Sequence, residues 1–394
     1  MTLRCPSGRP SVLGVQPPCV LHVSRPAVGG LRRHLETLLP RLSKCGWMVF
    51  LAAPAGLVGN GDAPLAGHPV LPVQIQDQPS PVADLRAAVQ LRRAIKRAEP
   101  SLVHCHGIRA AWVSWLAGHG KPQVVTVHNL FTLPRGIMQA YLARAALRSA
   151  VVIVAVSEAV RSSLVTADIP PERVCVIPNG IDPPEPVSPA DLSAFRKRLG
   201  PENFVPLVAC VARLMPDKGV DILLEAWRIA GSRIPGGALV IAGDGPDRPA
   251  LEAVASGLSG VRFLGFLPDV RPLYAAADIL VIPSRREGQS IVCLEAMMSQ
   301  PPPALLVTAA GGLPEMVHNG ETGLVVPPED PSALAEALVL LADDDGLRAC
   351  LATAAAATAR NRYTAAGMAD ATLEVYCRII PGAACDGRKG NSKP

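Results

Sequence analysis

The chain has 394 residues, of which 49% are hydrophobic, 18% are charged and only 4% are aromatic. This length predicts two or three domains, each large enough to bury a core, and excludes a mainly disordered chain. The longest apolar runs are strand-sized, and no unbroken apolar stretch near the N-terminus precedes a cleavage site. The sequence therefore predicts neither a membrane-spanning helix nor a secretion signal.

The distribution of charge limits the possible classes of binding partner, and the cysteines indicate the cellular compartment. Residues 1–190 hold 19 Lys and Arg against 10 Asp and Glu, whereas residues 191–394 hold 19 against 23. A basic half suits nucleic acid, an anionic membrane surface or an acidic substrate, and the low aromatic content disfavours nucleic acid. The ten cysteines include no Cys-x-x-Cys pair, which disfavours zinc and a disulfide framework and predicts a reducing cytoplasm.

Short apolar runs alternate with segments of helical period along both halves of the chain. The first half predicts strands near 19–23, 48–52, 102–105, 124–127, 151–156 and 175–177, and helices near 31–45, 82–98, 108–118 and 135–149. The second half predicts strands near 207–212, 238–242, 261–264, 279–283, 304–308 and 323–325. This alternation is typical of parallel sheets with crossover helices, so the predicted fold class is α/β with two doubly wound, Rossmann-like domains.

A proline-rich segment, 183–189, marks the predicted connection between the halves. The predicted organisation is a disordered leader over 1–18, a first domain over 19–188 and a second over 189–362. A C-terminal helix over 363–380 is expected to pack back toward the first domain, ahead of a disordered tail over 381–394.

Two glutamates stand at a predicted strand-to-helix transition. Glu287 follows the strand near 279–283, and Glu295 lies about one and a half turns into the next helix. Ligands bind open α/β sheets at such strand ends, and helical side chains lean toward the helix N-terminus, so both carboxylates can face one crevice. The backbone N–H groups of Gly288, Gln289 and Ser290, reinforced by the helix dipole, predict a phosphate cradle. Taken alone, glutamates at this spacing more often form a solvated face.

Two cations follow the first strand of the second half. Arg213 offers a planar fork for phosphate oxygens and Lys218 a compact charge, so together they can neutralise a diphosphate as it leaves. In isolation, solvated loop cations remain the commoner interpretation.

The first half carries weaker signals. Gly29 and Gly30 form a tight turn that opens a helix and lets backbone approach a ligand. His128, at a strand end, is a candidate hydrogen-bonding or proton-handling group, with an ordinary satisfied histidine as the alternative. His104 and His106 resemble a metal-ligand pair, but no third ligand is in view, so no metal site is predicted.

Two other enzyme classes are disfavoured. Residues 243–248 imitate the start of a dinucleotide fingerprint, but Arg248 occupies the third glycine position and no acidic residue ends the next strand, which argues against hydride transfer. The serines lack a Gly-x-Ser-x-Gly context, so a serine hydrolase has no support.

Taken together, these residues resemble those of glycosyltransferase family 4, the retaining nucleotide-sugar enzymes with the GT-B fold, in which two Rossmann-like domains face each other across a crevice. The resemblance runs from about residue 19 to about residue 380. The motifs that carry it are 29–30, 126–129, 156–158, 177–182, Arg213 with 218–219, 243–246, Glu287 with 295–297, and 311–315 ahead of Gly323. A single function accounts for all of these motifs in their order along the chain. This outweighs the alternative, in which each motif is an ordinary structural or solvated feature.

The resemblance implies a role for each site residue. Arg213 and Lys218 would hold the donor diphosphate, Glu295 would accept hydrogen bonds from the ribose hydroxyls, and Glu287 would position the transferred sugar. Gly29 and Gly30 would contact the phosphate or sugar, and His128 would approach the sugar from the acceptor side. No cofactor or metal is required, because two fixed cations take the place of a metal.

The resemblance thus implies a cytoplasmic hexosyltransferase that uses a nucleotide-sugar donor and a glycan or lipid-linked acceptor, in polysaccharide or glycolipid synthesis. Basic segments around residues 32–33, 86–97 and 135–148 suit an anionic membrane surface at its inner face, with a solvated face as the alternative. The rival interpretations are a nucleotide-sugar epimerase or hydrolase on the same fold, and a noncatalytic nucleotide-sugar-binding module.

Overall fold

The computed structural model describes residues 17–27, 29–54, 65, 67–134, 136–199 and 204–382. They divide into two compact units, one of residues 1–180 and 365–394 and the other of residues 181–364. The division falls at Gly180–Ile181, ahead of the proline-rich segment where the sequence predicts the boundary. The predicted leader over 1–18 and tail over 381–394 lie almost entirely outside the described residues.

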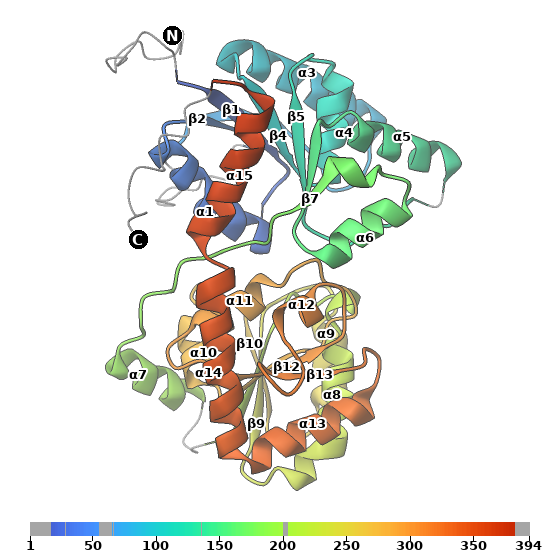
Figure 1. Ribbon diagram of the computed structural model, residues 1–394. Coiled ribbons are helices and arrows are strands. Elements are labelled where there is room, and N and C mark those ends of the chain that lie inside the picture. Colours follow the sequence, from blue (N-terminus) through green and yellow to red (C-terminus); the bar gives the residue numbers. More distant parts are fainter. Residues whose placement is uncertain are drawn as a thin grey trace. The chain divides into compact units, whose positions relative to one another are not determined.

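The first unit is built on a parallel seven-stranded sheet in the order β3-β2-β1-β4-β5-β6-β7 (Figure 1). Its strands are β1 (Cys19–Ser24), β2 (Met48–Ala53), β3 (Val70–Pro72), β4 (Leu102–His106), β5 (Gln123–Val127), β6 (Val152–Ala155) and β7 (Val174–Val176). The sequence prediction missed β3, because a three-residue edge strand ending in proline gives little periodic signal. The other strands of this sheet agree with the predicted ranges to within a few residues.

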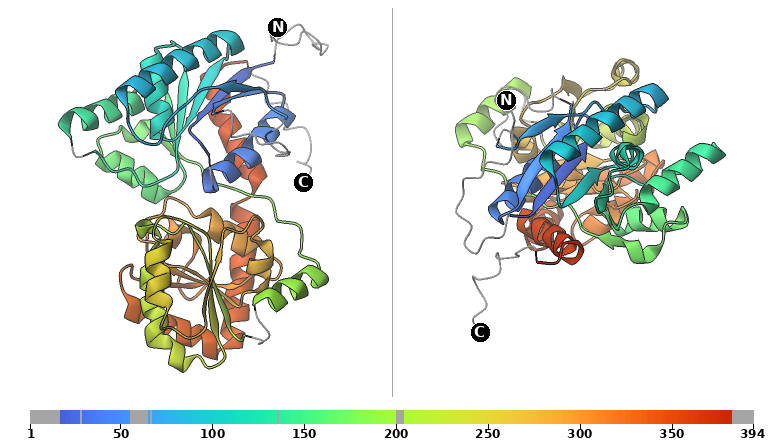
Figure 2. Two further views of the ribbon diagram at one scale, coloured as in Figure 1. Left: turned by 180° about the vertical axis from the view of Figure 1, so that it is seen from behind. Right: turned by 90° about the horizontal axis from the view of Figure 1, so that it is seen from above.

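Helices cover both faces of this sheet, so its central strands β1, β4 and β5 are buried along their whole length. They are α1 (Gly30–Lys44), α3 (Pro81–Ala98), α4 (Ile108–Ala117), α5 (Ile137–Arg148), α6 (Glu158–Thr166) and α15 (Ala365–Ile379). Side chains of α1 and α15 share one hydrophobic cluster, and those of α3 to α6 share another. Figure 2 shows the helices on either side of the sheet.

The helix α15, the last one among the described residues, therefore belongs to the first unit. On α15, Tyr376 is fully buried against Trp47, with ring centroids 5.0 Å apart, and its hydroxyl contacts His104 Nδ1 at 2.5 Å. Seven cysteines of the described residues are free thiols, whereas Cys377 on the same helix is disulfide-bonded.

The second unit repeats the scheme with a parallel six-stranded sheet in the order β10-β9-β8-β11-β12-β13. Its strands are β8 (Leu207–Val211), β9 (Ala238–Ala242), β10 (Val261–Gly265), β11 (Ile279–Ile282), β12 (Ala304–Thr308) and β13 (Leu324–Val326), close to the predicted ranges. Its helices are α7 (Pro189–Leu199), α8 (Val220–Ala230), α9 (Arg248–Ala255), α10 (Arg271–Ala276), α11 (Ile291–Met298), α12 (Leu313–Met316), α13 (Pro331–Asp343) and α14 (Asp345–Arg362).

Both sheets are thus doubly wound, as the fold-class prediction requires, and in each the order of strands reverses between two central neighbours. The reversal lies between β1 and β4 in the first unit and between β8 and β11 in the second. Ligands of open α/β sheets bind outside the carboxyl ends of such strands. None of the described helices combines the length and the apolar character needed to cross a membrane.

Candidate functional site

The carboxyl ends of β8 and β11 bring together two residues that the sequence analysis singled out. Lys218 follows β8, Glu287 follows β11, and Lys218 Nζ lies 2.7 Å from Glu287 Oε1. Ser284 Oγ donates to the same carboxylate oxygen at 3.0 Å. The side chains of Lys218 and Glu287 are 24% and 11% exposed, so the pair is held at the edge of the sheet with one side open to solvent. A carboxylate held by two donors has a fixed orientation.

Arg213 lies earlier in the same loop and behaves differently. It is exposed, and within the described part of the chain it forms no ion pair. Arg285, in the Glu287 loop, is by contrast fully engaged: its guanidinium contacts Asp221 at 2.7 Å and Glu329 at 2.6 Å. The backbone N–H of Arg285 also donates to Asp217 O at 2.9 Å, which ties the two loops together. Arg213 is therefore a cation of these loops whose charge no described residue neutralises.

Three glycines allow the loops at this edge to approach each other closely. A Cβ on Gly219 would overlap the carbonyl oxygen of Pro283, one on Gly243 that of Ala212, and one on Gly311 that of Glu287. All three have positive φ angles, which side chains disfavour. The loop after β12 consequently packs directly on the backbone of Glu287 and fixes where that residue stands.

Replacing Gly311 with alanine is expected to unfold or displace this loop. The change adds unfavourable φ and an overlap with backbone that cannot move aside, and it should cost at least about 3 kcal/mol. Gly320→Ala is the matched control, because Gly320 also has positive φ but a Cβ there meets no atom within 4 Å; about 1 kcal/mol is expected. Urea unfolding of both variants measures the difference, and equal losses would contradict the packing argument.

The second glutamate, Glu295, lies on α11 and is bonded to a tyrosine. Tyr274 Oη donates to Glu295 Oε2 at 3.1 Å, and burial, followed by the charge of Glu295, raises the pKa of Tyr274 well above its ordinary value. Tyr274 therefore remains a hydrogen-bond donor at neutral pH. Sequence reasoning missed Tyr274, which lies on the separate helix α10 and has no motif around it. It also missed Ser284, although Ser284 lies in the Glu287 loop itself.

The predicted phosphate cradle precedes α11. Gly288, Gln289 and Ser290 are buried there, and Ser290 Oγ accepts from the backbone N–H of Cys293 at 3.3 Å as the helix N-cap. The Ser290 hydroxyl thus serves to start the helix, a common role for serine. The predicted contact between the donor phosphate and the backbone N–H groups of Gly288, Gln289 and Ser290 remains a prediction.

In the first unit, Gly29 and Gly30 lie after β1, beside the point where strand order reverses. Gly29 is the N-cap of α1 with φ of 57°, a left-handed value that glycine tolerates, and both glycines are exposed. A Cβ on Gly29 would meet no atom within 4 Å. The backbone of this turn is therefore accessible, as expected for a turn that approaches a ligand.

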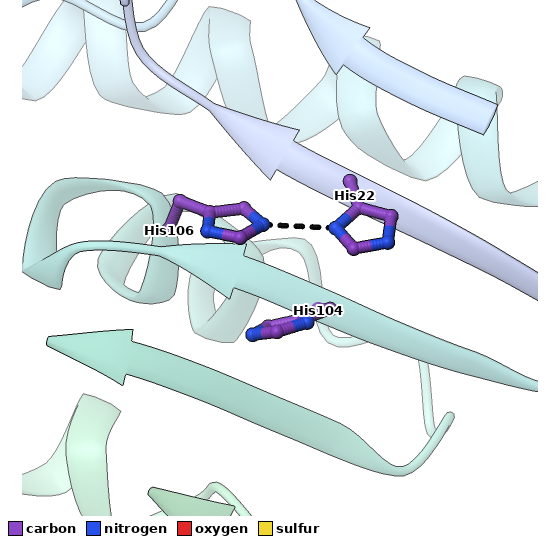
Figure 3. Close-up of side chains that lie close together, drawn as sticks. All are labelled: His22, His104 and His106. Atoms are coloured by element: carbon purple, nitrogen blue, oxygen red, sulfur yellow. Dashed lines mark hydrogen bonds between the residues drawn. The ribbon is translucent and has the colours of Figure 1, made fainter. Parts of the chain in front are cut away.

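Histidines cluster at the same end of the first sheet. His22 Nδ1 lies 2.8 Å from His106 Nε2 (Figure 3), and His106 Nδ1 lies 3.4 Å from His128 Nε2. The sequence analysis saw His104 and His106 as a pair and His128 separately. It missed His22 and His34, because the register that sets His22 opposite His104 cannot be read from the sequence.

Burial keeps these histidines uncharged. It lowers the pKa of His22 to about 3 and that of His34 to about 4. The pKa values of His104, His106 and His128 are also lowered well below the ordinary value, first by burial and then by the neighbouring histidines. At neutral pH, His128 is therefore a neutral imidazole that can accept or donate a hydrogen bond but carries no charge.

Comparison with known protein families supports the resemblance. The profile described as "Glycosyltransferase Family 4" matches residues 28–185, and the profile "Glycosyl transferases group 1" matches residues 205–344. The chain is 32% identical over 316 residues to an alpha-maltose-1-phosphate synthase of Mycolicibacterium smegmatis, covering 71% of this chain and 79% of that relative. The chain belongs to glycosyltransferase family 4.

Other proteins to which the chain is similar differ in what their names say they transfer. The chain is 38% identical over 190 residues to a GDP-mannose-dependent monoacylated alpha-(1-6)-phosphatidylinositol monomannoside mannosyltransferase of Corynebacterium glutamicum. That match spans 45% of this chain and only 49% of the relative. An alpha-D-kanosaminyltransferase of Streptomyces kanamyceticus is 30% identical over 318 residues, covering 75% and 81% of the two chains.

The fold comparison agrees with the family. The crystal structure of Anabaena HepE in complex with UDP and glucose matches with a TM-score of 0.79 at 24% identity, over 91% of this chain and 98% of that one. At this identity the likeness concerns the fold. The family 4 glycosyltransferase described here thus has the two Rossmann-like units of the GT-B fold.

Proposed function

We propose that this chain is a retaining glycosyltransferase that moves a hexose-type sugar from a nucleoside diphosphate to a glycan or lipid-linked acceptor, in polysaccharide or glycolipid synthesis. The observation that carries the proposal is the Lys218–Glu287 pair at the reversal point of the second sheet, with exposed Arg213 in the same loop. The two cations neutralise the diphosphate, Glu287 and Glu295 contact the sugar and the ribose, and Gly29, Gly30 and His128 contact the sugar from the first unit.

In the proposed reaction, the bond between the anomeric carbon and the diphosphate oxygen breaks as the acceptor oxygen attacks on the same face. The departing phosphate oxygen takes the acceptor proton, so the products are the glycoside and the protonated nucleoside diphosphate. The chain supplies positioning and charge stabilisation. Because Arg213 and Lys218 supply the positive charge, this step is proposed to need no metal on the diphosphate and no other cofactor.

The donor site is tested by thermal denaturation with UDP, GDP and ADP. A nucleotide at 100 times its dissociation constant adds about 2.7 kcal/mol to the stability of the folded state, which should raise the melting temperature by several degrees. The shift should disappear in Arg213→Ala/Lys218→Ala and persist in Arg228→Ala/Arg233→Ala, whose cations lie at the opposite end of α8. Binding unaffected in the first double variant would overturn the proposed site.

We further propose that the first unit docks on an anionic membrane surface through α3. Three exposed apolar residues, Val82, Leu85 and Val89, lie on the outer face of its first half, at 62%, 62% and 44% exposure. Exposed cations accompany them: Arg86 lies in the first half, and Arg92, Arg93, Lys96 and Arg97 lie in the second half, which carries no acidic residue. Such a face suits insertion beside anionic headgroups at the inner, cytoplasmic side of a membrane.

The other predicted basic segments are less available. Arg32 pairs with Glu36 at 2.8 Å, and Arg144 pairs with Asp168 at 2.9 Å, while Arg135 lies outside the described residues. The five cations of α3 form no ion pair within the described part of the chain. Arg92 and Lys96 also line a hollow with Lys121, where three cations stand beside the single carboxylate of Glu99.

Vesicle co-sedimentation tests this surface. Each arginine near an anionic membrane contributes about 1 kcal/mol, so Arg92→Ala/Arg93→Ala should weaken binding to phosphatidylglycerol-containing vesicles by about 30-fold. Leu85→Glu should also weaken it. Val254→Glu, an equally exposed change on α9 of the second unit, should not. Equally poor binding of the wild type to neutral and anionic vesicles would contradict membrane docking.

A further inference from the structure

A group of three histidines in the first unit has the features of a transition-metal site. His34 comes from α1, His106 from the end of β4 and His128 from the residue after β5. One ring nitrogen of each lies within 4.8 Å of the corresponding atoms of the other two. His34 and His106 are buried and His128 is half-buried, so the group can be reached from one side.

The tautomer of His34 is set by its neighbour. His34 Nδ1 lies 2.8 Å from Asn179 Oδ1, and an amide oxygen can only accept, so Nδ1 carries the proton. His34 Nε2 then presents a lone pair, and this atom is buried without a hydrogen-bond partner among the described residues. A metal-ligating histidine usually donates its other N–H to an oxygen in this way.

The other two histidines complete the set. His106 Nε2 is engaged with His22 Nδ1 at 2.8 Å, so His22 can hold the far side of the His106 ring (Figure 3). His106 Nδ1 faces His128 Nε2 at 3.4 Å. This is close to the separation of about 3.3 Å between two nitrogens that each lie about 2.05 Å from a tetrahedral zinc ion.

We propose that His34 Nε2, His106 Nδ1 and His128 Nε2 bind one transition-metal ion of the class that prefers imidazole, represented by Zn²⁺, with the fourth position open. Three neutral imidazoles and one open position form a ligand set that zinc accepts. Asn179 and His22 act as the outer partners that orient the ligands.

The overlapping group of His22, His104 and His106 is a poorer site. His104 is engaged at both ring nitrogens, by the Tyr376 hydroxyl at 2.5 Å and by Thr126 Oγ1 at 2.7 Å. His22 and His106 are bonded to each other. A metal ion there would have to break a hydrogen bond of His104, whichever ring nitrogen it used.

The proposed ion has a consequence for transfer, and this part rests on the proposed function. An ion on His128 Nε2 would hold that ring in the cluster and withdraw it from the sugar, so Zn²⁺ is expected to inhibit transfer by the full chain. Metal binding itself is measured without any donor or acceptor, so its failure is separate from failure of the proposed function.

The test is a titration of the metal-stripped full-length chain with Zn²⁺ in competition with a chromophoric chelator. One ion per chain is expected, bound at least about 100-fold more weakly by His34→Gln and by His128→Gln, and about 10-fold more weakly by Asn179→Leu, which removes an orienting partner rather than a ligand. His318→Gln, a partly exposed histidine of the second unit, is the control and should bind as the wild type does.

Two further measurements keep the result interpretable. Circular dichroism must show that His128→Gln is folded, which is expected because His128 is only half-buried. Co²⁺ in place of Zn²⁺ should give the intense visible absorption of a tetrahedral complex in the wild type and not in His128→Gln. No stoichiometric Zn²⁺ binding by the wild type, or equal binding by the wild type and both ligand variants, would overturn the proposal.

Discussion

Glu287→Ala is expected to lower the rate of sugar transfer by at least about 100-fold while leaving the protein folded and able to bind nucleotide. In the structure the Glu287 carboxylate is held by Lys218 Nζ and by Ser284 Oγ, so it can present a fixed acceptor to the hydroxyls of the sugar. Alanine removes that acceptor. Lys218 keeps its charge and its partial exposure, so the diphosphate contact is retained. Initial rates at saturating donor measure the effect.

Matched variants separate charge from shape. Glu287→Gln keeps the size of the side chain and removes its charge, and it should lie between the wild type and the alanine variant. Glu321→Ala, at a side chain that is 77% exposed, should transfer normally. Arg213→Ala should weaken nucleotide binding as well as transfer. Normal turnover in both Glu287→Ala and Arg213→Ala would remove the proposed site, and sugar release that does not depend on an acceptor would favour a hydrolase.

The stability of the first unit is expected to fall as the pH decreases below about 6.5. His22 and His34 have folded-state pKa values of about 3 and about 4, whereas an unfolded histidine titrates near 6.5. Below that value the unfolded chain binds more protons than the folded chain, so protonation favours unfolding. Each group costs about 1.4 kcal/mol per pH unit until its folded-state pKa is reached, about 3 kcal/mol for His34 alone.

Tryptophan fluorescence can report this loss for one unit. Trp47, Trp112 and Trp115 lie in the first unit and Trp227 in the second, so Trp227→Phe confines the signal to the first unit. Urea unfolding of this variant should give a markedly lower stability at pH 4.5 than at pH 7. Adding His34→Gln should reduce the dependence on pH by the contribution of one histidine. An unchanged free energy of unfolding across this range would show that the histidines do not remain neutral in the folded state.

The sequence predicted the site residues best where they follow directly on a recognisable strand. Arg213, Lys218 and Glu287 could be placed at carboxyl ends because the apolar runs before them are recognisable strands, and the parallel order then follows from alternation with helices. Their pairing across β8 and β11 could not be predicted, because strand order is a tertiary property. For the same reason Tyr274 escaped notice as the partner of Glu295, and so did His34, which meets His106 and His128 only through the fold.

The placement of α15 affects how the chain is completed during synthesis. The second unit is one continuous segment, residues 181–364, and all of its strands and helices have been made before α15 appears. The first unit is begun earlier but lacks Tyr376, which fills its cluster beside Trp47 and meets His104, until α15 is translated. Translation usually lets the N-terminal domain mature first. Here the earlier-made unit closes last, so a ribosome that stops before Ala365 leaves a finished second unit joined to an unfinished first one.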